Sequence, residues 1–324
     1  MKAVQVVSRG KLKFVETPVP ELAEGEALIR PVRLSLCASD VYFIHYMDDS
    51  RYPAPPGTTG HEMVGIVEAV NGTHPEVKVG DLTLTIVPEH RAMAEYYVSP
   101  FKHVLPVPAG VSPEHLLQAQ QLGTVIYACQ QLPSLIGKNV VVIGQGSAGL
   151  WFNTMLKRLG AQNIISVDKL GHRLDLSKQF GATHTINNDK EEPIAAVKNI
   201  LDGELADVVI EAVGEPETIN LAIDLATEYA FMLQFGVPHQ RQMQFNIREM
   251  FNKCITLKAI VIASREPNHT STRIALNMIA SGEVDAAPLL THRFPFDQVE
   301  DAYELQRSRQ DGAVKIIIDM PEKK

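Results

Sequence analysis

Residues 139–149, Asn-Val-Val-Val-Ile-Gly-Gln-Gly-Ser-Ala-Gly, decide the fold of this chain. An apolar strand runs directly into a glycine-rich turn, and the amphipathic stretch that follows predicts a helix. A G-x-G-x-x-G turn between a strand and a helix is typical of a dinucleotide-binding fold. Gly144 makes the tight turn, Gly146 lets backbone N–H groups approach a pyrophosphate, and Gly149 lets the helix pack closely on the sheet.

The predicted dinucleotide site extends into the next helix and strand. Ser147 and Ala148 open the helix whose N-terminus faces the pyrophosphate. Asp168 ends the next strand, nineteen residues after Gly149, where a carboxylate accepts hydrogen bonds from the ribose and repels a 2′-phosphate. NAD is therefore predicted over NADP, although Lys169 is a cation beside the ribose that tolerates a 2′-phosphate. A glycine turn that binds no dinucleotide is the alternative.

The chain around this motif divides into regions with different predicted secondary structure. Residues 122–264 alternate apolar strands with amphipathic helices, which predicts a doubly wound parallel sheet covered on both faces. The first 110 residues read as short strands separated by turns, and a helix begins near Ser112-Pro113-Glu114. The last 60 residues are too few for a separate domain. We therefore expect a β-rich domain from residues 1–121 and 265–324, with the nucleotide-binding domain between them.

Composition excludes several classes of protein. The 324 residues are 45% hydrophobic, and a net charge of −8 argues against a nucleic-acid partner. No apolar run reaches the roughly 20 residues that cross a bilayer, and basic residues interrupt the N-terminus before a signal peptide forms. Three widely spaced cysteines indicate a reducing compartment. We expect a cytoplasmic protein with no membrane partner.

A thiol, an imidazole and a carboxylate stand in predicted turns of the first region. Cys37 opens the segment Cys-Ala-Ser-Asp, and His61 and Glu62 follow Gly60. Thiolate and imidazole both suit zinc. The spacing of 24 residues between Cys37 and His61 does not by itself define a site, because a lone cysteine or histidine is more often a core or surface residue.

The order of the motifs along the chain strengthens the case for a zinc site. Cys-x-Ser-Asp at residue 37, Gly-His-Glu at residue 60, Val-Gly-Asp at residue 79, Ala-Glu-Tyr at residue 94 and the later glycine turn follow one another. Together they resemble the zinc-containing branch of the medium-chain dehydrogenase/reductase family, over essentially the whole chain. The resemblance implies an α/β fold: a GroES-like β-rich catalytic domain built from both chain ends, a Rossmann domain between them, and an active site at their junction.

The resemblance also implies a set of metal ligands. Cys37 and His61 match the zinc-ligand positions, and Glu62 matches the carboxylate that ligates or approaches the metal. Asp40 matches the carboxylate that orients the ligand histidine. Gln120 falls at the fourth ligand position, with Gln118, Gln121 or water as alternatives. No cysteine lies between Asp81 and Glu95, so the lobe for a second, structural zinc is absent and one zinc per chain is expected.

Further positions are assigned through the same resemblance. Ser39 matches the hydroxyl that contacts the substrate oxygen and starts proton release. Tyr42 stands where relatives have a relay histidine, so the proton leaves through water or His45. Residues that match the lining of the nicotinamide are Thr124, Val237 and the strand Ile260–Ile262, and Arg173 matches a cation near the adenosine ribose.

Five further histidines, two cysteines and the tryptophan are assigned no chemical role. We expect exposed turns at His74, His90, His103, His172 and His239, and packing roles for Cys129, Cys254 and Trp151.

These expectations define a zinc-dependent dehydrogenase that transfers hydride between NAD and a secondary alcohol, polyol or sugar. The alternatives are a zinc-free quinone-reductase-like enzyme of the same fold and a non-catalytic NAD-binding regulatory protein. The expected partners are a small alcohol or carbonyl substrate and further copies of the chain, in a homodimer or homotetramer.

Overall fold

The computed structural model describes residues 1–238, 240–260 and 265–323. The chain forms two compact units, Met1–Gly123 with Ser264–Lys324 and, between them in sequence, Thr124–Ala263. His239 and residues 261 and 262 of the expected Ile260–Ile262 strand lie outside the described residues.

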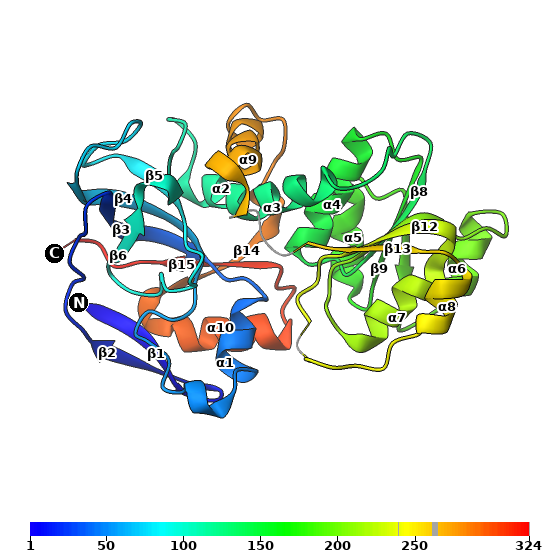
Figure 1. Ribbon diagram of the computed structural model, residues 1–324, viewed down its shortest axis with the longest axis horizontal. Coiled ribbons are helices and arrows are strands. Elements are labelled where there is room, and N and C mark those ends of the chain that lie inside the picture. Colours follow the sequence, from blue (N-terminus) through cyan, green and yellow to red (C-terminus); the bar gives the residue numbers. More distant parts are fainter. Residues whose placement is uncertain (239, 261–264, 324) are drawn as a thin grey trace. The chain divides into compact units, whose positions relative to one another are not determined.

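The first unit is built on a mixed sheet. Its described strands run in the order β14-β15-β3-β4-β5-β7, with β6 paired to β3, and every pair except β14 with β15 is antiparallel. In Figure 1 the red C-terminal strand β15 lies beside the blue strand β3, so the two ends of the chain share one sheet. The strands are β3 (Glu26–Ser35), β4 (Glu62–Asn71), β5 (Leu82–Ile86), β6 (Tyr97–Pro100), β7 (Val104–Pro106), β14 (Leu290–Pro295) and β15 (Lys315–Asp319).

A hairpin and short helices complete this unit. The hairpin of β1 (Lys2–Ser8) and β2 (Lys11–Glu16) forms its own two-stranded sheet and contributes apolar side chains to the core of the unit. The α-helices are α1 (Asp40–His45), α2 (Pro113–Leu117), α9 (Thr270–Ala280) and α10 (Val299–Ser308), and α3 (Ala119–Cys129) crosses the division at Gly123. The 3₁₀ turns are η1 (Asp49–Arg51), η2 (Phe101–His103), η4 (Pro267–His269), η5 (Ala287–Leu289) and η6 (Phe296–Gln298).

The second unit alternates strand and helix, as the apolar runs predict. Its described strands form a parallel sheet in the order β10-β9-β8-β11-β12-β13. The strands are β8 (Asn139–Ile143), β9 (Asn163–Asp168), β10 (His184–Asn187), β11 (Ala206–Glu211), β12 (Ala226–Gln234) and β13 (Thr256–Ala259). The helices are α4 (Ser147–Arg158), α5 (Gly171–Gln179), α6 (Pro193–Ile200), α7 (Pro216–Leu225) and α8 (Ile247–Asn252).

The burial of these strands explains their sequence. The side chains of Val140, Val141 and Val142 in β8 are fully buried, as expected for a central strand of a sheet covered on both faces. The strand order changes direction between β8 and β11, and in such sheets ligands bind beyond the carboxyl ends of the strands. The predicted fold class, a β-rich unit with a doubly wound parallel sheet, is confirmed. Within the described residues, no helix is both long and apolar enough to cross a bilayer.

Candidate active site

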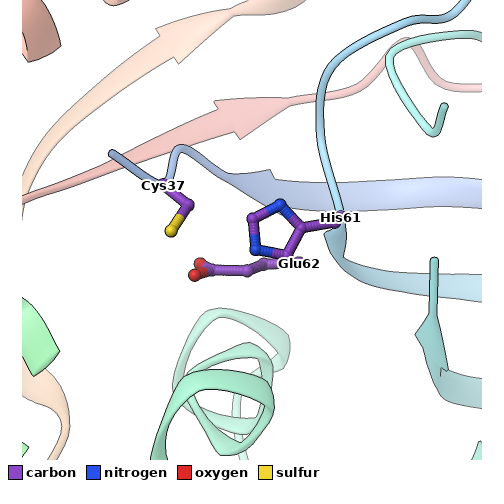
Figure 2. Close-up of side chains that lie close together, drawn as sticks. All are labelled: Cys37, His61 and Glu62. Carbon is purple, nitrogen blue, oxygen red and sulfur yellow. The ribbon is translucent and has the colours of Figure 1, made fainter. Parts of the chain in front are cut away.

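Pairing of β3 with β4 brings the three expected metal ligands together. Ser35 at the end of β3 lies opposite Glu62 at the start of β4, so Cys37, just after β3, and His61, just before Glu62, meet at the same edge. The ligand atoms of Cys37, His61 and Glu62 lie within 4.8 Å of one another. Figure 2 shows the three side chains converging on a common space. Two turns that are distant in sequence therefore form one cluster.

The Asp40 carboxylate holds this cluster in place through hydrogen bonds to both turns. This buried carboxylate accepts hydrogen bonds from Nδ1 of His61 at 3.2 Å, from the Gly60 amide at 3.1 Å and from the Cys37 amide at 3.2 Å. Burial opposes ionisation, but attraction to His61 and the hydrogen bonds outweigh it and lower the pKa of Asp40. With Nδ1 bound to Asp40, His61 keeps Nε2 for a metal.

His90 belongs to the same cluster, and its prediction as an exposed turn is wrong. The residue does lie in a turn, with φ of 52°, but its ring is turned inward and half-buried. Its Nδ1 atom lies 3.1 Å from Oδ1 of Asp40, and its ring centroid lies 4.0 Å from that of His61. Burial, followed by the charge of His61, lowers the pKa of His90, so its neutral form is favoured. Spacing along the chain gave no signal for this contact.

Glu62 has a cationic partner that the sequence analysis missed. Oε1 of Glu62 accepts a hydrogen bond from Nζ of Lys315 in β15 at 2.7 Å, and Oε2 forms an ion pair with the same Nζ at 2.6 Å and accepts a hydrogen bond from Ser35. Glu62 and Lys315 are both fully buried. Lys315, Ser35 and Glu62 meet because their strands, β15, β3 and β4, are neighbours in the sheet. The available signal was Lys315 itself, a lysine next to the apolar run Ile316–Ile318, because a buried lysine needs a partner.

The chemistry of this donor set fits zinc. Thiolate, imidazole nitrogen and carboxylate oxygen are its usual ligands. Cys37 as thiolate, Asp40 and Glu62 carry three negative charges and Lys315 one positive charge, so a dication brings the cluster to neutrality. Burial disfavours charge on His61, but Asp40 and Cys37 raise its pKa well above the ordinary value. The cluster therefore attracts positive charge at the point where the ligand atoms converge.

The glutamines near the predicted fourth ligand position lie around the start of α3. Gln120 is half-buried in the first turn of that helix. Gln118 and Gln121 are buried, and the Oε1 atom of each lacks a hydrogen-bond partner within the described residues. A buried amide oxygen without a hydrogen-bond partner can accept a hydrogen bond from a water or act as a neutral ligand of a metal. The assignment of Gln120 stays a prediction.

The residues of the expected proton path lie on and around α1. Ser39 is the residue that precedes this helix and is half-buried, and Tyr42 packs against the core of the first unit. His45 lies at the opposite end of the helix, where a Cβ atom on Gly10 would meet its ring at 3.4 Å. Burial lowers the pKa of His45, and the charges that act on it are those of Arg307, Glu304 and Arg9. None of these three charged residues is a predicted metal ligand, and the relay role of His45 stays a prediction.

The glycine turn of the second unit has the geometry that its sequence predicts. Gly144 adopts a left-handed φ of 92°, which a side chain would strain. A Cβ atom on Gly149 would collide with the carbonyl oxygen of Gly144, so the helix packs directly on the turn. A Cβ atom on Gly146 would meet only Nη1 of Arg173, at 3.8 Å. Ser147 and Ala148 form the first turn of α4, whose N-terminus suits an anion.

Asp168 and Arg173 flank this turn. Asp168 ends β9, and its carboxylate accepts hydrogen bonds from the amides of Gln145 at 2.6 Å and Leu170 at 2.9 Å. The Arg173 guanidinium was expected near the ribose, and it lies beside Gly146 of the phosphate turn. One carboxylate, Asp168, and one guanidinium, Arg173, therefore lie beside the glycine turn of the second unit.

The other expected cofactor contacts lie at strand and helix ends. Thr124 is nearly buried in α3, and Val237 follows β12 with a side chain that is 43% exposed. Gly214 and Gly236 pack so closely that a Cβ atom on either would collide with the other segment. Buried Glu211 holds this crossing, because it accepts hydrogen bonds from the Val213 and Gly214 amides, both at 2.9 Å.

Several minor predictions have clear outcomes. Trp151 and Cys129 are buried, as a packing role requires, whereas Cys254 is exposed and its packing assignment is wrong. His172 is exposed as expected. His74 and His103 are half-buried and hydrogen-bonded, so their assignment to exposed turns is wrong.

Comparison with known proteins agrees with this architecture. A family model described as an alcohol dehydrogenase GroES-like domain matches residues 23–109, and one described as a zinc-binding dehydrogenase matches residues 148–281. L-Threonine 3-dehydrogenase of Bacillus subtilis is 29% identical over 332 aligned residues, which cover 94% of each chain. Sorbitol dehydrogenase 1 of Saccharomyces cerevisiae is 28% identical over 99% of this chain and 98% of its own.

Among solved structures, the alcohol dehydrogenase TADH from Thermus sp. ATN1 superimposes with a TM-score of 0.84 and 25% identity. The superposition covers 99% of this chain and 100% of that one.

Both matched domains and these relatives define the class to which the fold and the cluster point: the chain is an oxidoreductase, a dehydrogenase that uses a nicotinamide dinucleotide. Within that class, it belongs to the zinc-containing medium-chain dehydrogenase/reductase family.

Proposed function

We propose that this protein is a zinc-dependent dehydrogenase that transfers hydride between NAD and a secondary alcohol, polyol or sugar. The convergence of Cys37, His61 and Glu62 on one space carries the proposal. The substrate class is supported by the relatives, which include threonine and sorbitol dehydrogenases. The polar segment after Cys37, with Tyr42 and His45, also favours a hydroxylated substrate.

One zinc per chain would be held by Cys37, His61 and Glu62, with the amide oxygen of Gln120 or a water as the fourth donor. When bound, zinc supplies a Lewis acid that acidifies an alcohol hydroxyl and polarises a carbonyl. Asp40 fixes the tautomer of His61 so that Nε2 faces the cluster. Lys315 holds the Glu62 carboxylate in place and offsets its charge.

Ser39 would orient the substrate hydroxyl and accept its proton. Tyr42 is a poor terminal acceptor at neutral pH, because a phenol has an ordinary pKa near 10. We therefore assign the last proton transfer to water. The polar environment of His45, among Arg9, Glu304 and Arg307, favours a role on the surface over one in the relay.

NAD is the proposed cofactor because Asp168 places a carboxylate beside the glycine turn. A carboxylate at the end of this strand accepts hydrogen bonds from ribose hydroxyls and repels a 2′-phosphate. Arg173 lies beside Gly146 and would compensate pyrophosphate charge.

The chain is also proposed to act as a homodimer or homotetramer. Within the described residues, β13 is an edge strand of the parallel sheet. Leu257 in β13 is 42% exposed, Phe251 in α8 is 78% exposed, and Tyr229 in the neighbouring strand β12 is 79% exposed. Exposed edge strands with apolar side chains are sites of pairing. Sedimentation velocity tests this, and a monomer at micromolar concentration would contradict it.

The activity is tested with purified protein, NAD⁺ and a panel of secondary alcohols, polyols and sugars, with NADH formation followed by absorbance. Wild-type protein is expected to reduce NAD⁺ with at least one member, and Cys37→Ser to lose that activity while it still binds NADH. Activity retained by Cys37→Ser would favour the zinc-free reductase. Zinc binding without activity on any substrate would favour a regulatory role.

A further inference from the structure

The first unit contains a second polar pocket that shares no residue with the metal cluster. Residues 74–76, 101–104 and 265–269 line it together with Arg273, and its volume is about 430 Å³. These segments are the turn before β5, the turn η2 and the turn η4 that leads into α9. A pocket of this volume suits a metabolite-sized ligand.

A buried histidine forms one wall of this pocket. His269 is only 3% exposed, and it and Asn268 both adopt left-handed backbone conformations, with φ of 50° and 58°. Nε2 of His269 lies 2.9 Å from Nδ1 of His103, so one proton joins the two rings. Nδ1 of His269 has no hydrogen-bond partner within the described residues. A buried polar atom left without a partner is unfavourable, and a bound ligand that supplies the partner would remove this cost.

The fixed charges around the histidine pair decide which ligand fits. Both carboxylates of the pocket are already occupied: Glu76 accepts two hydrogen bonds from Arg273, at 3.0 and 2.6 Å. Glu266 accepts from the amide and the hydroxyl of Ser271, at 2.7 and 3.0 Å. Lys102 and Arg265 also line the pocket, are exposed, and form no ion pair within the described residues. The pocket is lined by three cations, Lys102, Arg265 and Arg273, and by two carboxylates, Glu76 and Glu266, so positive charge is in excess by one.

Burial and nearby positive charge lower the pKa of both histidines. Burial, followed by the charge of His103 and then that of Arg273, lowers the pKa of His269 to about 4, against a smaller opposing effect of the Lys102 backbone, which favours the protonated ring. Burial and the charge of Lys102 lower the pKa of His103. Both rings are neutral near pH 7, so the pair has one N–H between the rings. When His103 donates it, Nδ1 of His269 carries a hydrogen and needs an acceptor.

We propose that this pocket binds a small organic oxyanion, a carboxylate or a phosphate ester, at a site separate from the metal cluster and the glycine turn. His269 Nδ1–H donates to the anion at the buried end, and Lys102 and Arg265 contribute charge at the open end. Hydrogen bonds to a charged acceptor are the stronger kind, so these few contacts suffice for specific binding. The proposal does not depend on the proposed dehydrogenase activity.

Isothermal titration calorimetry of the full chain tests the site with two probes, inorganic phosphate and citrate. The double variant Lys102→Gln/Arg265→Gln removes both unpaired cations. Lys11→Gln/Lys13→Gln is the matched control, because it makes the same charge change on exposed residues of β2. We expect the dissociation constant to rise about tenfold in the first pair and to stay within about twofold of wild type in the control. Tighter binding of phosphate indicates a phosphate ester, and tighter binding of citrate a carboxylate.

A second pair of variants tests the buried histidine. His269→Gly removes the ring and tolerates the left-handed backbone, and Asn268→Gly makes the same backbone change while it keeps the ring. Only His269→Gly is expected to weaken binding, by about tenfold.

Three results would overturn the proposal. The first is no saturable binding of either probe at about 10 mM. The second is equal affinity in wild type and both test variants, which would place the anion elsewhere, such as at the glycine turn. The third is a second zinc per chain that His269→Gly removes, which would make the histidine pair a cation site.

Discussion

His90 Nδ1 lies 3.1 Å from the same Asp40 oxygen that holds His61, so one buried carboxylate bridges two imidazoles. The backbone carbonyl of His90 accepts a hydrogen bond from the Thr59 amide at 2.8 Å, which fastens the His90 turn to the segment that leads to His61 and β4. This turn lies in the connection between Asp81 and Glu95, which contains no cysteine. The short connection thus supplies a histidine to the metal cluster.

His90→Asn tests this contribution. Asparagine tolerates the left-handed backbone at this position, so the turn is kept while the ring is lost. We expect zinc affinity, measured by competition with a chelator, to fall by about tenfold, because partners that orient metal ligands contribute 10–100-fold. His184→Asn, at an exposed site in the second unit, is the control. Unchanged affinity in His90→Asn would mean that Asp40 holds His61 without help.

The buried pair of Glu62 and Lys315 predicts a large effect on stability. Lys315→Met leaves a buried carboxylate without its cation, and such a loss costs about 3–5 kcal/mol. Urea denaturation of the metal-depleted protein measures it. Lys323→Met removes an exposed partner of Glu68 and is expected to cost less than about 1 kcal/mol. The double variant Lys315→Met/Glu62→Gln should recover part of the loss. Equal stability of the two lysine variants would contradict the account of this pair.

Asp168 provides the test of cofactor preference. Asp168→Asn removes the negative charge but keeps an oxygen for the amide of Gln145 or Leu170. We expect the ratio of kcat/KM for NADP to that for NAD to rise about tenfold, because repulsion of the 2′-phosphate is relieved. Steady-state kinetics with both cofactors measure the ratio. A ratio that does not move would show that Asp168 only supports the turn.

The depressed pKa of His269 predicts a dependence of stability on pH. The pKa of the folded state is about 4, below the ordinary 6.5, so between these values the unfolded chain binds more protons. The contribution of His269 to the free energy of unfolding is fully present above about pH 6.5 and is lost as pH falls toward 4, by about 3 kcal/mol. Urea denaturation at several pH values across this range gives the free energy of unfolding as a function of pH. This free energy should change less steeply with pH for His269→Gly than for Asn268→Gly. Identical slopes would mean that His269 titrates normally.

The sequence predicts the local features of this protein well and the contacts between distant segments poorly. Gly144 and Gly149 have the roles that their positions in a strand-turn-helix motif require, because steric limits act within a few residues. Cys37 and His61 were found through a resemblance of whole motifs, and their spacing alone did not pair them. Lys315 escaped notice because its partner, Glu62, lies 253 residues away and meets it only through the order of three strands.

The same limit explains the errors. His90 and His103 are each predicted in an exposed turn, yet each ring contacts a partner from another segment, Asp40 or His269. Cys254 shows the reverse case, since cysteine is usually buried but here occupies an exposed turn with φ of 53°. Tertiary contacts decide the burial of single polar or sulfur-containing side chains, and these contacts have no local pattern.

Zinc stoichiometry in matched cysteine variants tests the central claim most directly. Cys37→Ser removes the thiol of the cluster, whereas Cys254→Ser changes an exposed cysteine of the second unit. Purified wild-type protein and Cys254→Ser are predicted to contain about one zinc per chain by elemental analysis, and Cys37→Ser much less, with its fold intact by circular dichroism. Wild-type protein without zinc, or Cys37→Ser with as much zinc as wild type, would contradict the assignment of Cys37, His61 and Glu62 as the catalytic metal site.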